Sequence, residues 1–143
     1  MPALLDVNVL LAIIHGDHLY HASAVAWVGT VSAKASLIIC RISQYGLLRL
    51  LNNPAVMGPD VKSGREVWKI WDNLLRDDRF TFAEEPQEFE KHFRTVTLML
   101  KYQPKRWQDA ALAAFALAAN LEVVTFDRDF RSFAGLRHRL LVP

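Results

Sequence analysis

The sequence predicts a three-layer α/β/α fold with a mainly parallel central sheet. Short apolar runs alternate with longer segments whose apolar residues recur at helical spacing. The run Ser36–Cys40 is apolar on both faces, which is typical of a strand buried inside a parallel sheet. Because parallel strands need crossover helices, the alternation favours helices on both faces of one sheet. The 143 residues are expected to form a single domain, residues 1–143.

The N-terminal half of the chain predicts two strands and three helices. In order, these are a strand at Ala3–Leu5, helices at Val7–His15 and His18–Ala33, a strand at Ser36–Cys40 and a helix at Arg41–Asn53. Pro54 ends the last helix, because proline disfavours helical geometry in the residue before it.

The C-terminal half continues the same alternation. We expect a helix at Pro59–Asp78, a strand at Phe80–Glu84, helices at Glu84–Tyr102 and Trp107–Glu122, and strands at Val123–Asp127 and Arg139–Val142. Pro59-Asp60 is a favourable helix start, and Asn120 a favourable helix stop.

Composition excludes a disordered or fibrous chain, because 52% of residues are hydrophobic and 22% are charged. The net charge of +2 is compatible with a polyanionic partner without demonstrating one. Cys40 is the only cysteine, so no disulfide can form within the chain. The apolar N-terminal segment lacks a basic leader, contains Asp6 and is too short to span a membrane. We therefore expect a cytoplasmic protein without a membrane anchor.

Acidic residues follow two of the predicted strands and begin one predicted helix. Asp6 ends the first strand, Asp127 and Asp129 follow the strand at 123–127, and Asp109 lies in the first turn of an alanine-rich helix. Taken singly, these residues could be helix caps or turn formers. Their joint placement at the carboxyl ends of the strands, where α/β sheets bind ligands, favours a shared site.

Carboxylates crowded at one edge repel each other, and a hard divalent cation relieves that repulsion. Mg²⁺ or Mn²⁺ prefers oxygen ligands and often binds together with a substrate phosphate. Such an ion can activate water for attack on a phosphodiester. Asn8 and Thr125 are placed to steady the ligands by hydrogen bonds.

Four blocks of this sequence resemble the PIN-domain ribonucleases, specifically toxins of the VapC type. They are LLDVNVLL, ISQYGLLRLLNNP, WQDAALAAFA and VVTFDRDF, in the order found in that family, and they span almost the whole chain. The resemblance implies a parallel sheet flanked by helices, acidic residues that hold Mg²⁺ or Mn²⁺, and endonucleolytic cleavage of RNA. It also implies an antitoxin partner and a homodimer. The family's first, third and fourth acidic positions fall on Asp6, Asp109 and Asp127.

The second acidic position is where the chain departs from that pattern. Many members of the family have glutamate where this chain has Gln44. Glutamine keeps a carbonyl oxygen that can reach a metal, but it lacks the negative charge and cannot act as a base. We therefore expect weaker metal binding, with Asp129 either restoring some charge or serving as an exposed turn residue. Gln44 could equally be an ordinary polar residue on a helix.

Basic residues near the predicted edge are candidates for holding RNA phosphates. They are Arg41, Lys105, Arg106, Arg128 and Arg131. Each could also be an ordinary solvated surface residue.

Two other functions remain open from the sequence. Gln44 is compatible with a catalytically weak module that binds RNA or protein without cutting. A phosphatase of the haloacid dehalogenase kind also has an aspartate after its first strand. That chemistry usually needs a second aspartate two residues later, where this chain has Asn8.

Overall fold

The computed structural model describes residues 1–143 and contains one five-stranded sheet in the order β3-β2-β1-β4-β5. The strands are β1 (Ala3–Leu5), β2 (Leu37–Ile39), β3 (Phe80–Phe82), β4 (Glu122–Thr125) and β5 (His138–Leu140). Every neighbouring pair is parallel, and Leu4 of the central strand pairs with Ile38 on one side and Val123 on the other. The predicted α/β fold with a parallel sheet is therefore confirmed.

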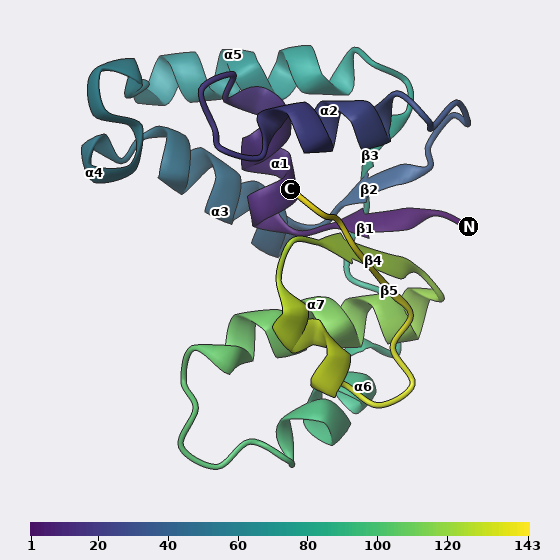
Figure 1. The fold of residues 1–143 in the computed structure, drawn as a ribbon. Coiled ribbons are helices and arrows are strands. Elements are labelled where there is room, and N and C mark those ends of the chain that lie inside the picture. The colour runs from purple at the N-terminus through teal and green to yellow at the C-terminus, as the bar shows by residue number, and fades with distance from the viewer.

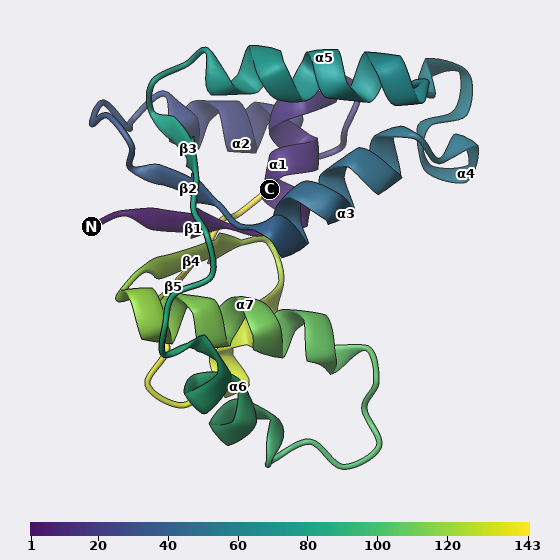
Figure 2. The same cartoon turned by 180° about the vertical axis from the view of Figure 1, so that it is seen from behind.

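Helices cover both faces of the sheet, which gives the expected three layers (Figures 1 and 2). One face carries α1 (Val7–Ile14), α2 (His21–Val28), α3 (Arg41–Leu51), α4 (Pro54–Met57), the 3₁₀ turn η1 (Gly58–Asp60) and α5 (Gly64–Leu75). The other face carries α6 (Phe89–Thr97), α7 (Arg106–Ala119) and the 3₁₀ turn η2 (Arg128–Ser132). No helix has both the length and the apolar character needed to cross a membrane.

The core divides into two apolar clusters, one on each side of the sheet. Leu5 and Val124 pack with Trp71 and the α1–α5 layer, whereas Leu4 and Val123 pack with the α6–α7 layer. Neighbouring residues of a strand point to opposite faces, so β1 and β4 contribute to both clusters. These central strands are buried on both faces, as the sequence predicted.

Several helix boundaries differ from the prediction. The fourth predicted helix begins after Ser63 rather than at Pro59, because Ser63 and Glu66 form a reciprocal capping box. Pro59 lies in η1 instead. The segment predicted to be helical from residue 84 is helical only in α6, since Pro86 disfavours a helical residue before it. The predicted stop at Asn120 is confirmed, and its φ of 56° places it in the left-handed region.

The second predicted helix is also shorter than expected, because α2 covers only His21–Val28 of the segment His18–Ala33. Its apolar residues beyond Val28 do not continue the helix past Gly29, which has low helix propensity. The turns α4 and η2 were not predicted, because each is shorter than the window needed to recognise helical periodicity.

Candidate active site

The site lies at the carboxyl ends of β1 and β4, which are adjacent in the sheet. Leu5 pairs with Val124, so the residues that follow these two strands emerge side by side. The backbone N–H of Asp6 continues this pairing by donating to the carbonyl oxygen of Val124 at 3.0 Å. The topology thus brings Asp6 next to a segment more than a hundred residues later in the chain.

Asp6 is fixed in place by two hydrogen bonds to its carboxylate. Its Oδ1 accepts from the backbone N–H of Val7 at 2.7 Å, and its Oδ2 accepts from the Thr125 hydroxyl at 2.7 Å. The side chain is only 7% exposed. Burial raises the pKa of Asp6, an effect that the bonds to Thr125 and Val7 oppose and the charge of Asp127 increases. Asp6 therefore caps α1, which is one of the roles that the sequence allowed for it. Its carboxylate is also part of the acidic edge.

Thr125 is the centre of a hydrogen-bond network that joins three elements. Its hydroxyl oxygen donates to Asp6 and accepts from the backbone N–H of Asp127 at 2.9 Å. The amide nitrogen of Asn8 lies 3.5 Å from the same oxygen, and the Asn8 carbonyl oxygen accepts from the N–H of Phe126 at 3.4 Å. Thr125 thus bonds directly to two of the proposed ligands, Asp6 and Asp127, whereas Asn8 contacts only Thr125 and Phe126 and reaches the acidic residues through them.

Asp109 enters the site from the opposite helical layer. It lies in the first turn of α7 and is half-buried. Burial and the charges of Asp6 and Asp127 raise its pKa to about 7, with a smaller contribution from Asp129 and a partial offset by Arg106. The structure therefore brings Asp109 into the electrostatic range of the carboxylates after β1 and β4.

Asp127 and Asp129 lie together at the start of η2. The carboxylate of Asp127 accepts from the backbone N–H of Asp129 at 2.8 Å and caps this turn. Asp127 is half-buried, whereas Asp129 is exposed. Arg106 attaches η2 to α7, because its guanidinium donates to the Asp129 carbonyl oxygen at 3.1 Å and to the Ser132 hydroxyl at 2.7 Å.

This donor set suits a hard divalent cation by its chemistry. All its charged groups are carboxylates. Burial, together with the charges of Asp6 and Asp127, raises the pKa of Asp109, and Arg106 offsets this effect only in part. In the present arrangement no three acidic, histidine or cysteine side chains converge closely enough to chelate an ion. A shared ion therefore requires these side chains to turn toward one another.

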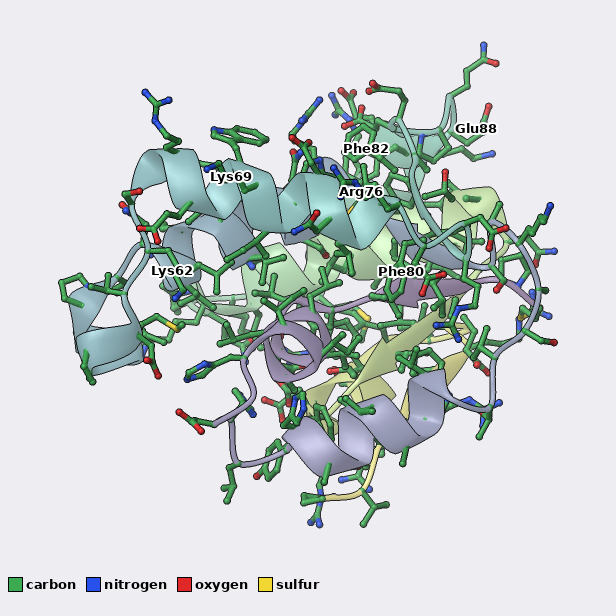
Figure 3. The ribbon with its side chains drawn as sticks, turned by 90° about the horizontal axis from the view of Figure 1, so that it is seen from above. Lys62, Lys69, Arg76, Phe80, Phe82 and Glu88 are labelled. Carbon is green, nitrogen blue, oxygen red and sulfur yellow. The ribbon has the colours of Figure 1, made fainter.

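Gln44 lies in the first turns of α3, shortly after β2, and accepts a hydrogen bond from an arginine side chain. It is 5% exposed, and its Oε1 accepts from the guanidinium of Arg41 at 2.5 Å. The same guanidinium lies 4.5 Å from the centre of the Phe82 ring at the end of β3. In Figure 3, Phe82 lies beyond the C-terminal end of α5, on the way to Glu88. Sequence reasoning missed Phe82, because it lies in the middle of the predicted strand Phe80–Glu84 and no motif marks it.

Sequence reasoning also missed Ser43, which holds α3 against β1. Its hydroxyl donates to the carbonyl oxygen of Leu5 at 2.8 Å, and the side chain is fully buried. The bond connects the helix that carries Arg41 and Gln44 to the residue before Asp6. No motif marks such a serine, because its partner is a backbone atom in a distant strand.

The basic residues differ in how far they are free to meet a ligand. Arg106 is committed to η2 and also stacks its guanidinium 4.9 Å from the Phe133 ring. Arg41, Lys105, Arg128 and Arg131 are exposed. The structure thus gives Arg106 a structural task. Arg41 and Arg131 each donate one hydrogen bond, to Gln44 and to the Arg128 carbonyl oxygen, yet they remain exposed, as Lys105 and Arg128 do.

A protein-family model and curated relatives both match this chain over nearly its whole length. Residues 3–136 match the PIN domain. The chain is 38% identical to Ribonuclease VapC41 of Mycobacterium tuberculosis over 96% of its own length and 97% of the relative's. It is 33% identical to Ribonuclease VapC44 of the same organism, covering 90% of the chain and 87% of the relative.

Solved structures support the same fold. The VapC20 toxin of Mycobacterium tuberculosis, which cleaves the sarcin–ricin loop, aligns with a TM-score of 0.68 and 14% identity over 94% of this chain and 95% of the other. The VapBC2 complex of Rickettsia felis, bound to a DNA fragment from its promoter, aligns with a TM-score of 0.68, 14% identity and 98% coverage of both chains.

Proposed function

The chain belongs to the PIN-domain family, and on that premise we propose that it is the ribonuclease toxin of a toxin–antitoxin pair and cuts RNA with the aid of a divalent metal ion. The ribonuclease and toxin assignments follow from its VapC relatives, which match it over nearly their full length. The observation that carries the metal dependence is the gathering of carboxylates at the acidic edge, where burial and then the charges of Asp6 and Asp127 raise the pKa of Asp109 to about 7.

Asp6, Asp109 and Asp127 are the residues proposed to hold Mg²⁺ or Mn²⁺, with Asp129 as a further ligand. When bound, such an ion supplies an activated water and neutralises charge on the phosphodiester. The chain's own contribution is orientation: Thr125 and the N–H of Val7 hold the Asp6 carboxylate, and Asn8 joins the ends of β1 and β4. Lowering the pKa of Asp109 through ion binding would keep this carboxylate charged at neutral pH.

Exposed basic side chains at this edge are proposed to bind the RNA backbone. Arg41, Lys105, Arg128 and Arg131 carry charge that phosphates can neutralise, which predicts binding that weakens as salt increases. Arg106 would act mainly by holding η2, and with it Asp127 and Asp129, against α7.

The activity is tested by incubating the purified chain with single-stranded and hairpin RNA in the presence of Mg²⁺ or Mn²⁺. We expect endonucleolytic fragments that disappear when EDTA is added. Asp6→Asn and Asp109→Asn should each abolish cleavage, whereas Asp72→Asn on the exposed side of α5 should cleave normally. Cleavage that persists in EDTA would contradict the metal mechanism, and RNA binding without cleavage would favour the weak binding module.

The proposed partners are a cognate antitoxin, an RNA substrate and a second copy of this chain, and the proposed location is the cytoplasm. The antitoxin is supported by VapBC complexes among the proteins that share this fold. Exposed apolar side chains on neighbouring helices, including Tyr45 at 66% and Trp68 at 51% exposure, support a protein partner at this surface, either the antitoxin or a second copy of this chain.

A further inference from the structure

We infer that Gln44 is a positioning residue that holds Arg41. Arg41 in turn binds the RNA phosphate next to the phosphodiester that is cut. This inference rests on the proposed function and assigns position 44 to substrate alignment instead of metal binding. It also gives Phe82 a role, as the surface on which the guanidinium rests.

The contacts of Arg41 fix one side of its guanidinium and leave the rest available. One N–H group donates to Gln44 at 2.5 Å, and the flat face lies 4.5 Å from the centre of the Phe82 ring. Arg41 forms no salt bridge and is exposed to solvent. A guanidinium has five N–H donors in a planar fork, so the remaining donors can bind a phosphate without losing these contacts.

Gln44 suits this task because it is buried and neutral. Its side chain is 5% exposed, so the oxygen that meets Arg41 is held in a restricted position. A carboxylate in the same place would neutralise the guanidinium and compete with phosphate for it. Glutamine keeps the acceptor and adds no negative charge beside Arg41.

The order of the strands separates this cation from the carboxylates along the sheet edge. Arg41 follows β2 and rests on the end of β3, whereas Asp6 and Asp127 follow β1 and β4. Adjacent strands are about 4.8 Å apart, so Arg41 and Asp6 are separated by roughly one or two such spacings. A strand of RNA crossing this edge would place one phosphate at the carboxylates and a neighbouring phosphate at Arg41.

The test measures RNA binding without cleavage, by fluorescence anisotropy of a labelled single-stranded RNA in EDTA at several salt concentrations. We expect Arg41→Gln to weaken binding about tenfold and to reduce the salt slope by about 0.7, the value for one phosphate contact on a single strand. Gln44→Leu should weaken binding roughly threefold while the slope is kept. The double variant should bind like Arg41→Gln alone, because Gln44 acts through Arg41.

Arg49→Gln is the matched control, since Arg49 is an exposed arginine on the same helix, two turns away. It should change affinity less than twofold. Gln44→Glu, which preserves side-chain shape, should weaken RNA binding in EDTA and change Mn²⁺ affinity less than threefold by calorimetry. Thermal unfolding checks that each variant is folded.

Four results would overturn the inference. Wild-type affinity in Arg41→Gln would reject the phosphate contact while leaving the ribonuclease proposal intact. If Gln44→Leu weakened RNA binding equally in the wild-type chain and in the Arg41→Gln variant, Gln44 would not act through Arg41. Much tighter Mn²⁺ binding by Gln44→Glu, with unchanged RNA binding, would assign residue 44 to the metal site. Failure of the wild-type chain to bind RNA would overturn the proposed function as well.

Discussion

At the scale of single residues, Asp109 is a carboxyl group whose ionised form is disfavoured by its surroundings. Its pKa is raised from 3.8 to about 7, so the folded protein without metal binds more protons than the unfolded chain between these pH values. The free energy of unfolding therefore falls as pH rises through this range. Without a metal ion, the ionised form of Asp109 therefore lowers the free energy of unfolding.

Replacing Asp109 by asparagine should stabilise the metal-free protein at high pH. We expect the free energy of unfolding at pH 8 to rise by about 1–2 kcal/mol, less than the full shift implies because the side chain is partly exposed to solvent. At pH 4 the change should be small. Urea unfolding in EDTA at both pH values measures this difference, with Asp72→Asn as the control. An unchanged pH dependence would show that Asp109 is ordinarily ionised in the folded state.

Sequence reasoning identified the acidic residues because each one follows a strand or begins a helix, and parallel topology brings such positions to one edge. It could not find the contacts that organise them. Arg106 looked like a phosphate ligand, but its bonds to Asp129 and Ser132 depend on how η2 folds back onto α7. The approach of Arg41 to Phe82 likewise depends on the pairing of β2 with β3, which periodicity does not specify.

At the scale of elements, the close packing of α3 against α1 bears directly on the site. Gly46 of α3 faces Val7, and a methyl group at Gly46 would lie 2.7 Å from Val7 Cγ2. The N–H of Val7 in turn holds the Asp6 carboxylate. The absence of a side chain at residue 46 therefore allows the approach that fixes the first turn of α1.

Gly46→Ala should destabilise the protein by about 1–3 kcal/mol, because overpacking at a rigid contact forces backbone or side-chain shifts. It should also lower cleavage by displacing Asp6. Gly64→Ala is the control: nothing lies within 4 Å of the added methyl group, and residue 64 begins α5. That variant should be neutral or more stable by up to about 1 kcal/mol. Chemical denaturation and the RNA assay would contradict the argument if both variants behaved alike.

The elements themselves were predictable in kind but not in extent. Apolar runs located all five strands, most clearly β1, whose three residues are all buried. The edge strand β5 has no buried residue and carries His138 and Arg139, so only the apolar residues from Leu140 onward marked it. Helix ends were less certain, since they depend on particular side chains: Ser63 and Glu66 begin α5 five residues after the expected start. Proline alone was a poor guide, because Pro59 lies in a 3₁₀ turn and does not begin α5.

At the scale of the whole molecule, apolar side chains remain exposed after both sides of the sheet are filled. Tyr45 and Trp68 border a hollow of about 470 Å³ between α3 and α5, and Arg41 and Gln44 line its other end. A partner bound there would lie next to the residues proposed to align RNA. Binding of an antitoxin near this edge would therefore block the substrate without contacting every ligand of the metal.

Expression of this chain alone should slow bacterial growth, and co-expression with the small open reading frame beside its gene should restore it. Asp109→Asn should remove the growth defect without reducing the amount of folded protein. Growth curves with matched immunoblots measure both effects. Normal growth with abundant wild-type protein would argue against a toxin.

The all-parallel sheet also determines when activity can arise during synthesis. β1 is made first, yet it lies in the centre of the sheet and pairs with β4 near the other end of the chain. The bond between Thr125 and Asp6 spans 119 residues, and Asp127 follows later still. A chain translated only as far as α7 therefore lacks the part of the acidic edge that β4 and η2 supply. A ribosome making this protein is not exposed to its nuclease activity until almost the whole chain has been produced.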